Sequence, residues 1–271
     1  MAGLQDIHTH TIYCDGKRTP EEMVMAALEK GCDSFGFSGH ANAPFDLKFS
    51  MTEDETLSYI DDIGRLKEKY AGRIELFTGI EQDYYSFSSP DGFEFVIGTV
   101  HYIQKGDKYV SVDAGARNQK QAVDIYFGGD YYTMAEEYFA TVAGVVEKTR
   151  ADIVGHFDLV TKYNSGGSRF DESNPRYVDA ALGAMEEVLK GCRLFEVNTG
   201  AMYRQNKTAP YPSAFLLSEL CKRGGEVILT SDSHDTESIC YKFGEMRDLL
   251  KACGFKYMKR LTQDGFIDIK I

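Results

Sequence analysis

Short apolar runs, each closed by a polar residue, recur along the whole chain. The runs are four to eight residues long and rich in β-branched and aromatic types, which is typical of buried strands. They occupy residues 4–7, 34–38, 74–80, 93–100, 152–155, 193–197 and 226–231. The pattern therefore predicts seven strands.

Most of the predicted strands are separated by stretches in which apolar residues repeat with the helical period. Three of these stretches begin with the S/T-x-x-E pattern of a capping box, at Thr19, Thr52 and Thr133, and Pro20 fills the first helical position after Thr19. Further helices are predicted near residues 176–189, 213–222 and 236–251.

Alternation of strands with helices indicates an α/β protein with a parallel sheet and right-handed crossovers. Seven such units close more easily into a barrel than they form an open sheet, so we expect a (β/α)7 barrel in a single domain over residues 1–271. The segment 104–130 is the least regular part of the chain. Because long loops in compact domains are commonly functional, it is predicted to fold over the site as a lid.

Each predicted strand ends in side chains that can bind a metal ion or polarise a substrate. The C-terminal ends of parallel barrel strands converge on one face, where active sites are built. These side chains include all six histidines of the chain and are His8, His10, His40, Glu81, His101, His156, Asn198, Asp232 and His234. A single strand-end histidine is usually structural, but six together favour a shared metal site.

The spacing of these residues suits chelation. His8 and His10 lie two residues apart, on one face of an extended strand, and the same period relates Asp232 to His234. Imidazole and carboxylate ligands without a thiolate pattern favour an open catalytic site for Zn, Mn or Fe. Asp15 is a further candidate, although Asp15-Gly16 also reads as a simple turn.

With Asp15 added and Asn198 left out, nine candidate ligands are present, too many for one ion, so two or three divalent ions are expected. Such clusters lower the pKa of water and neutralise phosphoryl charge. Glu81, at the end of a strand, could bridge two of the ions.

The acidic composition limits the classes of partner. Thirty basic and 42 acidic residues give a formal charge of −12, which opposes binding to nucleic acid or anionic lipid and favours a small phosphorylated metabolite. The first residues lack the pattern of a signal peptide, and no run of 18 apolar residues occurs. We therefore expect a cytoplasmic protein without a membrane segment. Its oligomeric state is not indicated.

Seven separated motifs together resemble the polymerase and histidinol phosphatase (PHP) family. They are HTHT at 8–11, DG at 15–16, SGH at 38–40, GIE at 79–81, TVHYI at 99–103, GHFDLVTKY at 155–163 and TSDSH at 230–234. The resemblance spans nearly the whole chain. It implies a distorted (β/α)7 barrel with a trinuclear site of zinc, iron or manganese.

The resemblance also implies how the ligands are shared, with Glu81, Asp232 and His234 as the catalytic residues. The implied sets are His8, His10, Glu81 and Asp232 for one ion, Glu81, His101 and His156 for a second, and Asp15, His40 and His234 for a third.

Within the family, the segments GHFDLVTKYN and EVNTGAMYRQNKTAPYPS are similar to those of histidinol-phosphate phosphatases, which implies hydrolysis of L-histidinol phosphate in histidine biosynthesis. The segment YIQKGDKYVSVDAGAR after His101 departs from that pattern. For capture of the phosphate the first candidate is Arg204, because a guanidinium binds phosphate in a bidentate manner. Lys162 and Arg117 follow, and Asn198 is expected to orient the substrate or a ligand.

Three alternatives stay open at this stage. The same metal site could act on nucleotides, oligonucleotide ends or phosphotyrosyl proteins. A non-catalytic, metal-stabilised scaffold would be expected to have lost ligands, yet every ligand position is filled. A metal-dependent amidohydrolase also carries H-x-H on its first strand, but it usually has a bridging lysine where this chain has Glu81.

Overall fold

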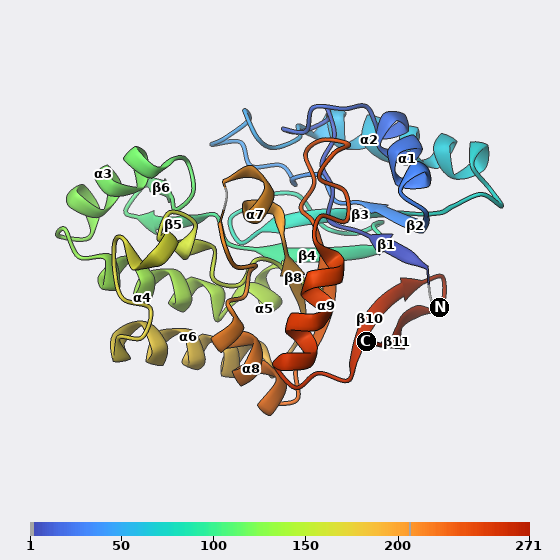
Figure 1. Ribbon diagram of the computed structural model, residues 1–271. Helices are drawn as coiled ribbons and strands as arrows, with labels where there is room; N and C mark the ends of the chain where they lie inside the picture. Colours follow the sequence, from blue (N-terminus) through green and yellow to red (C-terminus); the bar gives the residue numbers. More distant parts are fainter. Residues whose placement is uncertain (1–2, 206) are drawn as a thin grey trace.

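A seven-stranded parallel sheet forms the centre of the molecule (Figure 1). The computed structural model describes residues 3–205 and 207–271, so position 206, inside the segment that begins EVNT, lies outside the described residues. The sheet has the order β1-β2-β3-β4-β7-β8-β9. Its strands are β1 (Leu4–Asp6), β2 (Cys32–Phe37), β3 (Glu75–Asp83), β4 (Phe95–Thr99), β7 (Ile153–Val154), β8 (Leu194–Asn198) and β9 (Glu226–Thr230).

The first and last strands of this sheet meet and nearly close it into a barrel. Thr9 and Ser233 form a parallel bridge just beyond β1 and β9. The backbone N–H of His10 donates to the carbonyl of Ser233 over 2.7 Å, and the N–H of Ser233 donates to the carbonyl of His8 over 3.0 Å. The predicted (β/α)7 barrel is confirmed, with its seam directly at the H-x-H and D-x-H motifs.

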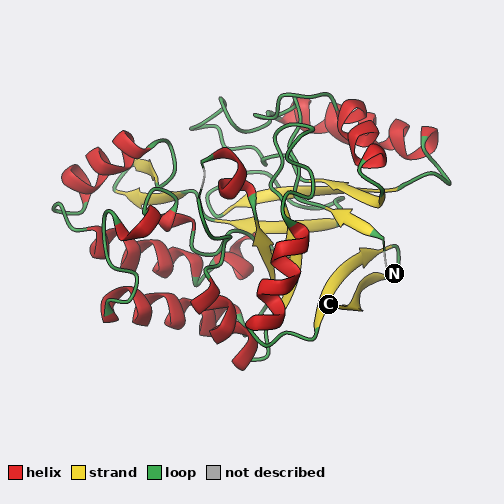
Figure 2. Ribbon diagram, in the orientation of Figure 1, coloured by secondary structure: helices red, strands yellow, loops and turns green. Residues whose placement is uncertain are grey.

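Helices flank the strands on both sides (Figure 2). They are α1 (Pro20–Glu29), α2 (Glu53–Lys69), α3 (Ala116–Tyr126), α4 (Tyr131–Val142), α5 (Val145–Thr149), α6 (Pro175–Val188), α7 (Gly200–Arg204), α8 (Ala214–Lys222) and α9 (Phe243–Ala252), with short 3-10 turns at Leu159–Thr161 and Ser165–Gly167. Apolar side chains of α1 and α2 form one buried cluster with the sheet, and those of α3 to α9 form another. No helix in the described ranges is long and apolar enough to cross a membrane.

Two of the three predicted capping boxes form. The hydroxyls of Thr19 and Thr52 accept from the backbone three residues on, and the Glu22 and Glu55 carboxylates accept in return from the backbone N–H groups of Thr19 and Thr52. Each box satisfies two N–H groups that would otherwise lack a partner at the start of the helix. The predicted starts of α1 and α2 are therefore confirmed.

Two predicted helix starts are wrong. Helix α4 begins at Tyr131, because Asp130 accepts from the N–H of Tyr132 and caps the helix. The hydroxyl of Thr133 instead donates to the Asp130 carboxylate over 3.0 Å. Helix α9 begins only at Phe243, whereas the stretch predicted to start it at 236 forms turns.

The segment 104–130 is also more regular than expected. It contains most of a β-hairpin, β5 (Tyr102–Lys105) and β6 (Lys108–Ser111), followed by α3. Gly106 in the hairpin turn has a φ of 64°, a left-handed conformation that glycine adopts without strain. A second hairpin, β10 (Tyr257–Thr262) and β11 (Gly265–Lys270), packs beside β9 and was not predicted.

Candidate metal centre

Glu81 lies at the middle of a ring of imidazoles near the C-terminal end of β3. One carboxylate oxygen, Oε1, is 2.9 Å from His156 Nε2 and 3.5 Å from His101 Nε2. The other, Oε2, lies 2.9 Å from the Nδ1 of His40. Oε2 is also 3.3 Å from the Nε2 of His8 and 3.4 Å from the Nε2 of His10. Five of the six histidines, from the ends of β1, β2, β4 and β7, thus converge on one buried carboxylate.

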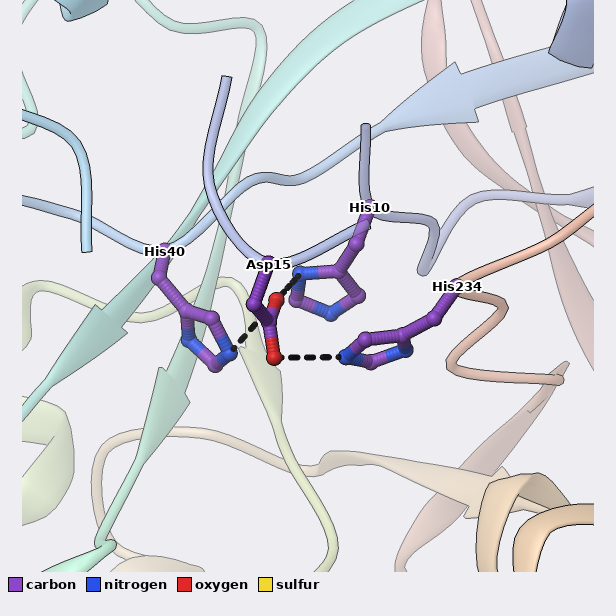
Figure 3. Close-up of side chains that lie close together, drawn as sticks. All are labelled: His10, Asp15, His40 and His234. Atoms are coloured by element: carbon purple, nitrogen blue, oxygen red, sulfur yellow. Dashed lines mark hydrogen bonds and ion pairs between the residues drawn. The ribbon is translucent and has the colours of Figure 1, made fainter. Parts of the chain in front are cut away.

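Asp15 forms a second focus beside the first (Figure 3). Its Oδ2 is 3.1 Å from His234 Nε2, and its Oδ1 is 3.6 Å from His10 Nδ1 and 3.7 Å from His40 Nε2. In Figure 3 the carboxylate lies between the three rings. The loop after β1 therefore brings Asp15 into the cluster. The sequence alone did not decide between this role for Asp15 and a place in a simple turn.

Asp232 completes a third group with the two histidines of the first strand end. Its Oδ1 lies 3.2 Å from His10 Nε2 and 3.8 Å from His8 Nε2. The backbone of Asp232 has a φ of 49°, which is uncommon for a residue with a side chain and is found mainly where surrounding contacts hold it. The guanidinium of Arg204 donates to both the carbonyl and the carboxylate of Asp232, so Arg204 supplies those contacts.

Ligand atoms in these groups come close enough to share metal ions. In each of the following sets, one ligand atom per residue lies within 4.8 Å of the others: His10, Asp15, His40 and His234; His8, His10 and Asp232; His40, Glu81 and His101. Several of the atoms that face the centre are buried and lack a hydrogen-bond partner among the described residues, including His8 Nε2, His10 Nε2, Asp15 Oδ1 and Glu81 Oε2. Buried polar atoms are rarely left without partners. The donor set and its unpartnered atoms fit divalent ions.

The electrostatics of the cluster favour the metal-binding protonation states of Glu81 and His10. Burial alone would raise the pKa of Glu81, but the imidazoles of His40 and His8 hold it well below its usual range. Burial and the neighbouring rings of His234 and His40 lower the pKa of His10 to about 3. At neutral pH Glu81 is therefore ionised and His10 is neutral, and these are the forms in which the two side chains coordinate ions. At His8, His40 and His101, burial lowers the imidazole pKa, but nearby carboxylates outweigh it and raise the pKa above its usual value, so an ion that binds there displaces protons.

A cavity of about 210 Å³ opens beside the cluster. Of the residues predicted to contact substrate, Arg204 and Lys162 line it, although Lys162 is paired with Asp113 over 2.7 Å. Asn198 is fully buried behind the cluster, where its Nδ2 lies 3.3 Å from Asp232 Oδ2. Arg117 is exposed on α3 and is not among the residues lining the cavity.

The predicted lid segment borders this cavity. Ser111, Asp113 and Ala114 line it, together with Tyr102 just before the segment. The hairpin that carries Tyr102 and Ser111 follows directly on His101, and Asp113 and Ala114 lie in the loop between this hairpin and α3.

Glu196 in β8 takes part in the site, although the sequence pattern assigned it no role. Its Oε2 accepts from His8 Nδ1 and from the hydroxyl of Thr230, both over 2.7 Å. Its Oε1 accepts from the N–H of His156 over 2.5 Å and from Asn198 Nδ2 over 2.9 Å. By accepting the hydrogen bond from Nδ1–H, Glu196 keeps the proton of His8 on Nδ1 and leaves Nε2 available to an ion. The available signal was a charged residue within an apolar strand, two positions before Asn198 and so on the same face.

Replacing Glu196 with glutamine is expected to weaken metal binding roughly 10- to 100-fold, because an amide nitrogen cannot accept the bonds that orient the histidine ligands. Competition with a metal-sensitive dye would measure the affinity. Glu226→Gln, at the far end of the neighbouring strand β9, is the matched control and should bind metal like the wild type. Unchanged affinity in Glu196→Gln would show that His8 needs no such support.

A (β/α)7 barrel with an imidazole and carboxylate cluster at its strand ends defines a class of metal-binding barrel proteins. Within this class, the sequence profile of the PHP domain matches residues 6–200. The chain belongs to the PHP domain family.

Individual proteins match this chain along most of their length, in sequence or in structure. A protein from Deinococcus radiodurans named "Probable histidinol-phosphatase" is 27% identical over 264 residues, which cover 92% of this chain and 95% of that protein. A crystal structure of histidinol phosphate phosphatase from Lactococcus lactis, in complex with zinc, L-histidinol and phosphate, has a TM-score of 0.73 at 22% identity and covers 97% of this chain and 98% of its own. A crystal structure of a histidinol phosphatase homologue from Listeria monocytogenes has a TM-score of 0.76 at 20% identity. The match covers 89% of this chain and 99% of that chain.

Proposed function

We propose that this protein is a metal-dependent phosphomonoesterase that hydrolyses L-histidinol phosphate to L-histidinol and phosphate, a reaction of histidine biosynthesis. The observation that carries the proposal is the convergence of six histidines on Glu81, Asp15 and Asp232 beside one cavity. The Deinococcus and Lactococcus proteins, both named for this activity, support the same substrate. We further propose that residues 1–271 form one domain and that the protein acts in the cytoplasm.

The proposed centre holds two or three divalent ions of zinc, manganese or iron. We propose His8, His10, Asp15, His40, Glu81, His101, His156, Asp232 and His234 as their ligands. When bound, such ions lower the pKa of a water molecule and neutralise charge on the phosphoryl oxygens. The Lactococcus structure contains zinc, which is one of these three metals.

The chain's own residues would position the phosphate ester. Glu81 has imidazoles beside both of its oxygens and would fix the positions of these imidazole ligands relative to one another. Arg204 and Lys162 line the cavity and are cations that can hydrogen-bond to phosphate oxygens. In this proposal Arg204 contributes twice, since it also holds Asp232 in its positive-φ conformation.

The competing substrates are less well supported. A net charge of −12 repels oligonucleotides and other polyanions. Nucleoside monophosphates are phosphomonoesters with far less charge than a polymer, so they are the rivals that an assay must include. A non-catalytic scaffold would have no need of the open cavity beside a complete ligand set.

Steady-state kinetics of the metal-loaded protein on a panel of phosphate esters tests the substrate. We expect kcat/KM for L-histidinol phosphate to exceed the values for nucleoside monophosphates and p-nitrophenyl phosphate by roughly 100-fold or more, since a site built for polar groups discriminates strongly against analogues that lack them. If p-nitrophenyl phosphate were hydrolysed equally well, the reaction class would survive but the substrate would be wrong.

A further inference from the structure

The cavity beside the metal centre has a second wall that the phosphate chemistry does not use. This wall comes from the loop between β2 and α2, with Asp46, Phe49 and Ser50, and from Tyr102 at the start of the β5–β6 hairpin. The hydroxyl of Tyr102 donates to Asp46 Oδ2 over 2.8 Å and ties the loop to the hairpin. The two elements therefore present one polar surface to the cavity.

Asp46 differs from the other carboxylates of the cavity in having no cationic partner. Asp113 is paired with Lys162 over 2.7 Å, and Asp83 accepts from the backbone and ring of His101. Asp15, Glu81 and Asp232 belong to the metal cluster. Within the described ranges no lysine, arginine or histidine forms an ion pair with Asp46. A carboxylate left uncompensated on a cavity wall attracts a cation and repels a second phosphate.

Aromatic rings pack around Tyr102, the hydrogen-bond partner of Asp46, and add a flat apolar surface. Phe45 meets the ring of Tyr102 edge-on, with centroids 4.9 Å apart, and stacks on Tyr109 at 4.0 Å. Phe49, on the cavity wall, is 37% exposed. The Nζ of Lys48 already lies 5.2 Å from the centroid of this ring, and a planar ring of a ligand can pack against its exposed part.

We propose that Asp46, positioned by Tyr102, binds the cationic amine end of the phosphate ester while the metal centre holds its phosphate. The inference rests on the proposed function and names the residue that sets specificity within the same site. L-Histidinol phosphate fits this division, because it carries a primary ammonium group and an imidazole ring apart from its phosphate. Nucleoside monophosphates and p-nitrophenyl phosphate carry no cationic group at neutral pH and would gain nothing from Asp46.

The test compares two substrates in the metal-loaded protein. In Asp46→Asn the ratio of kcat/KM for L-histidinol phosphate to that for p-nitrophenyl phosphate should fall roughly 10- to 100-fold, the usual worth of a hydrogen bond to a charged group. Asp107→Asn removes the same charge from an exposed hairpin turn that does not line the cavity, and it should keep the wild-type ratio. In Tyr102→Phe the ratio should fall by a smaller factor, because the carboxylate remains but loses its support.

Inhibition gives a second readout that does not depend on turnover of the natural substrate. L-Histidinol should inhibit hydrolysis of p-nitrophenyl phosphate by the wild type, and its inhibition constant should rise in Asp46→Asn by about the same factor as the ratio falls. A wild type that prefers histidinol phosphate, with an Asp46→Asn variant that keeps this preference, would overturn the role of Asp46 and leave the proposed function standing. A wild type without the preference would overturn both.

Discussion

Replacing Glu81 with glutamine is expected to lower kcat for hydrolysis of L-histidinol phosphate by roughly 10³-fold or more, because several kcal/mol of transition-state stabilisation depend on the ions. Glutamine keeps the size of the side chain but replaces one oxygen with an NH₂ group. Whichever way the amide is turned, one set of imidazoles then faces a donor: His156 and His101 on one side, or His40, His8 and His10 on the other. We therefore expect the variant to lose metal as well as activity.

The control for this variant lies on the same strand. Glu75 begins β3, at the end away from the cluster, and Glu75→Gln should retain wild-type kcat and metal content. Both proteins should be compared by circular dichroism, so that loss of fold is distinguished from loss of the centre. A folded Glu81→Gln protein with more than a tenth of the wild-type kcat would exclude Glu81 from a central role.

Removal of metal should have the second large effect. Without ions, the unpartnered atoms of the buried imidazoles and carboxylates have no metal to bind. Hydrolysis should then fall to the rate of the buffer control. Ions that bind only the folded state stabilise it by about 4 kcal/mol at a thousand times Kd. For a chain of this size that corresponds to a rise in Tm of roughly 8–16 °C.

The measurement is a pair of assays on chelator-treated, dialysed protein. Activity and Tm should both recover on addition of Zn²⁺ or Mn²⁺, while Ca²⁺, which prefers oxygen ligands, should restore little of either. Tm distinguishes a structural from a catalytic contribution of the ions. Unaltered hydrolysis by protein shown to be free of metal would contradict the mechanism.

The parts of the fold that were predicted correctly are those with strong local patterns. The seven buried strands stand out because parallel strands covered on both faces are continuously apolar. A polar residue after each apolar run marks the end of the strand. The capping boxes at Thr19 and Thr52 follow from local hydrogen bonds alone. At Thr133 the same four-residue pattern failed because Asp130, three residues earlier, caps the helix instead.

Elements with weak local patterns, and contacts between residues distant in sequence, were harder to predict. The β5–β6 hairpin has one local signal, the Gly106-Asp107 turn, but its strands are only four residues long and polar residues flank the turn. The role of Glu196 in the site depends on His8, which is 188 positions away in the chain. Asp46 lies in a loop without periodicity, and its place beside Tyr102 depends on tertiary structure.

The most direct test of the metal centre and of its proposed reaction is a titration of the metal-free protein with Zn²⁺ or Mn²⁺, in which bound metal and hydrolysis of L-histidinol phosphate are measured on the same samples. The proposed ligands, eight of which fall in three overlapping groups, predict that the rate stays near background at low occupancy and reaches its maximum only when two or three ions are bound per chain. A rate that is maximal at one ion per chain, or that is independent of metal, would contradict a multi-ion phosphatase centre.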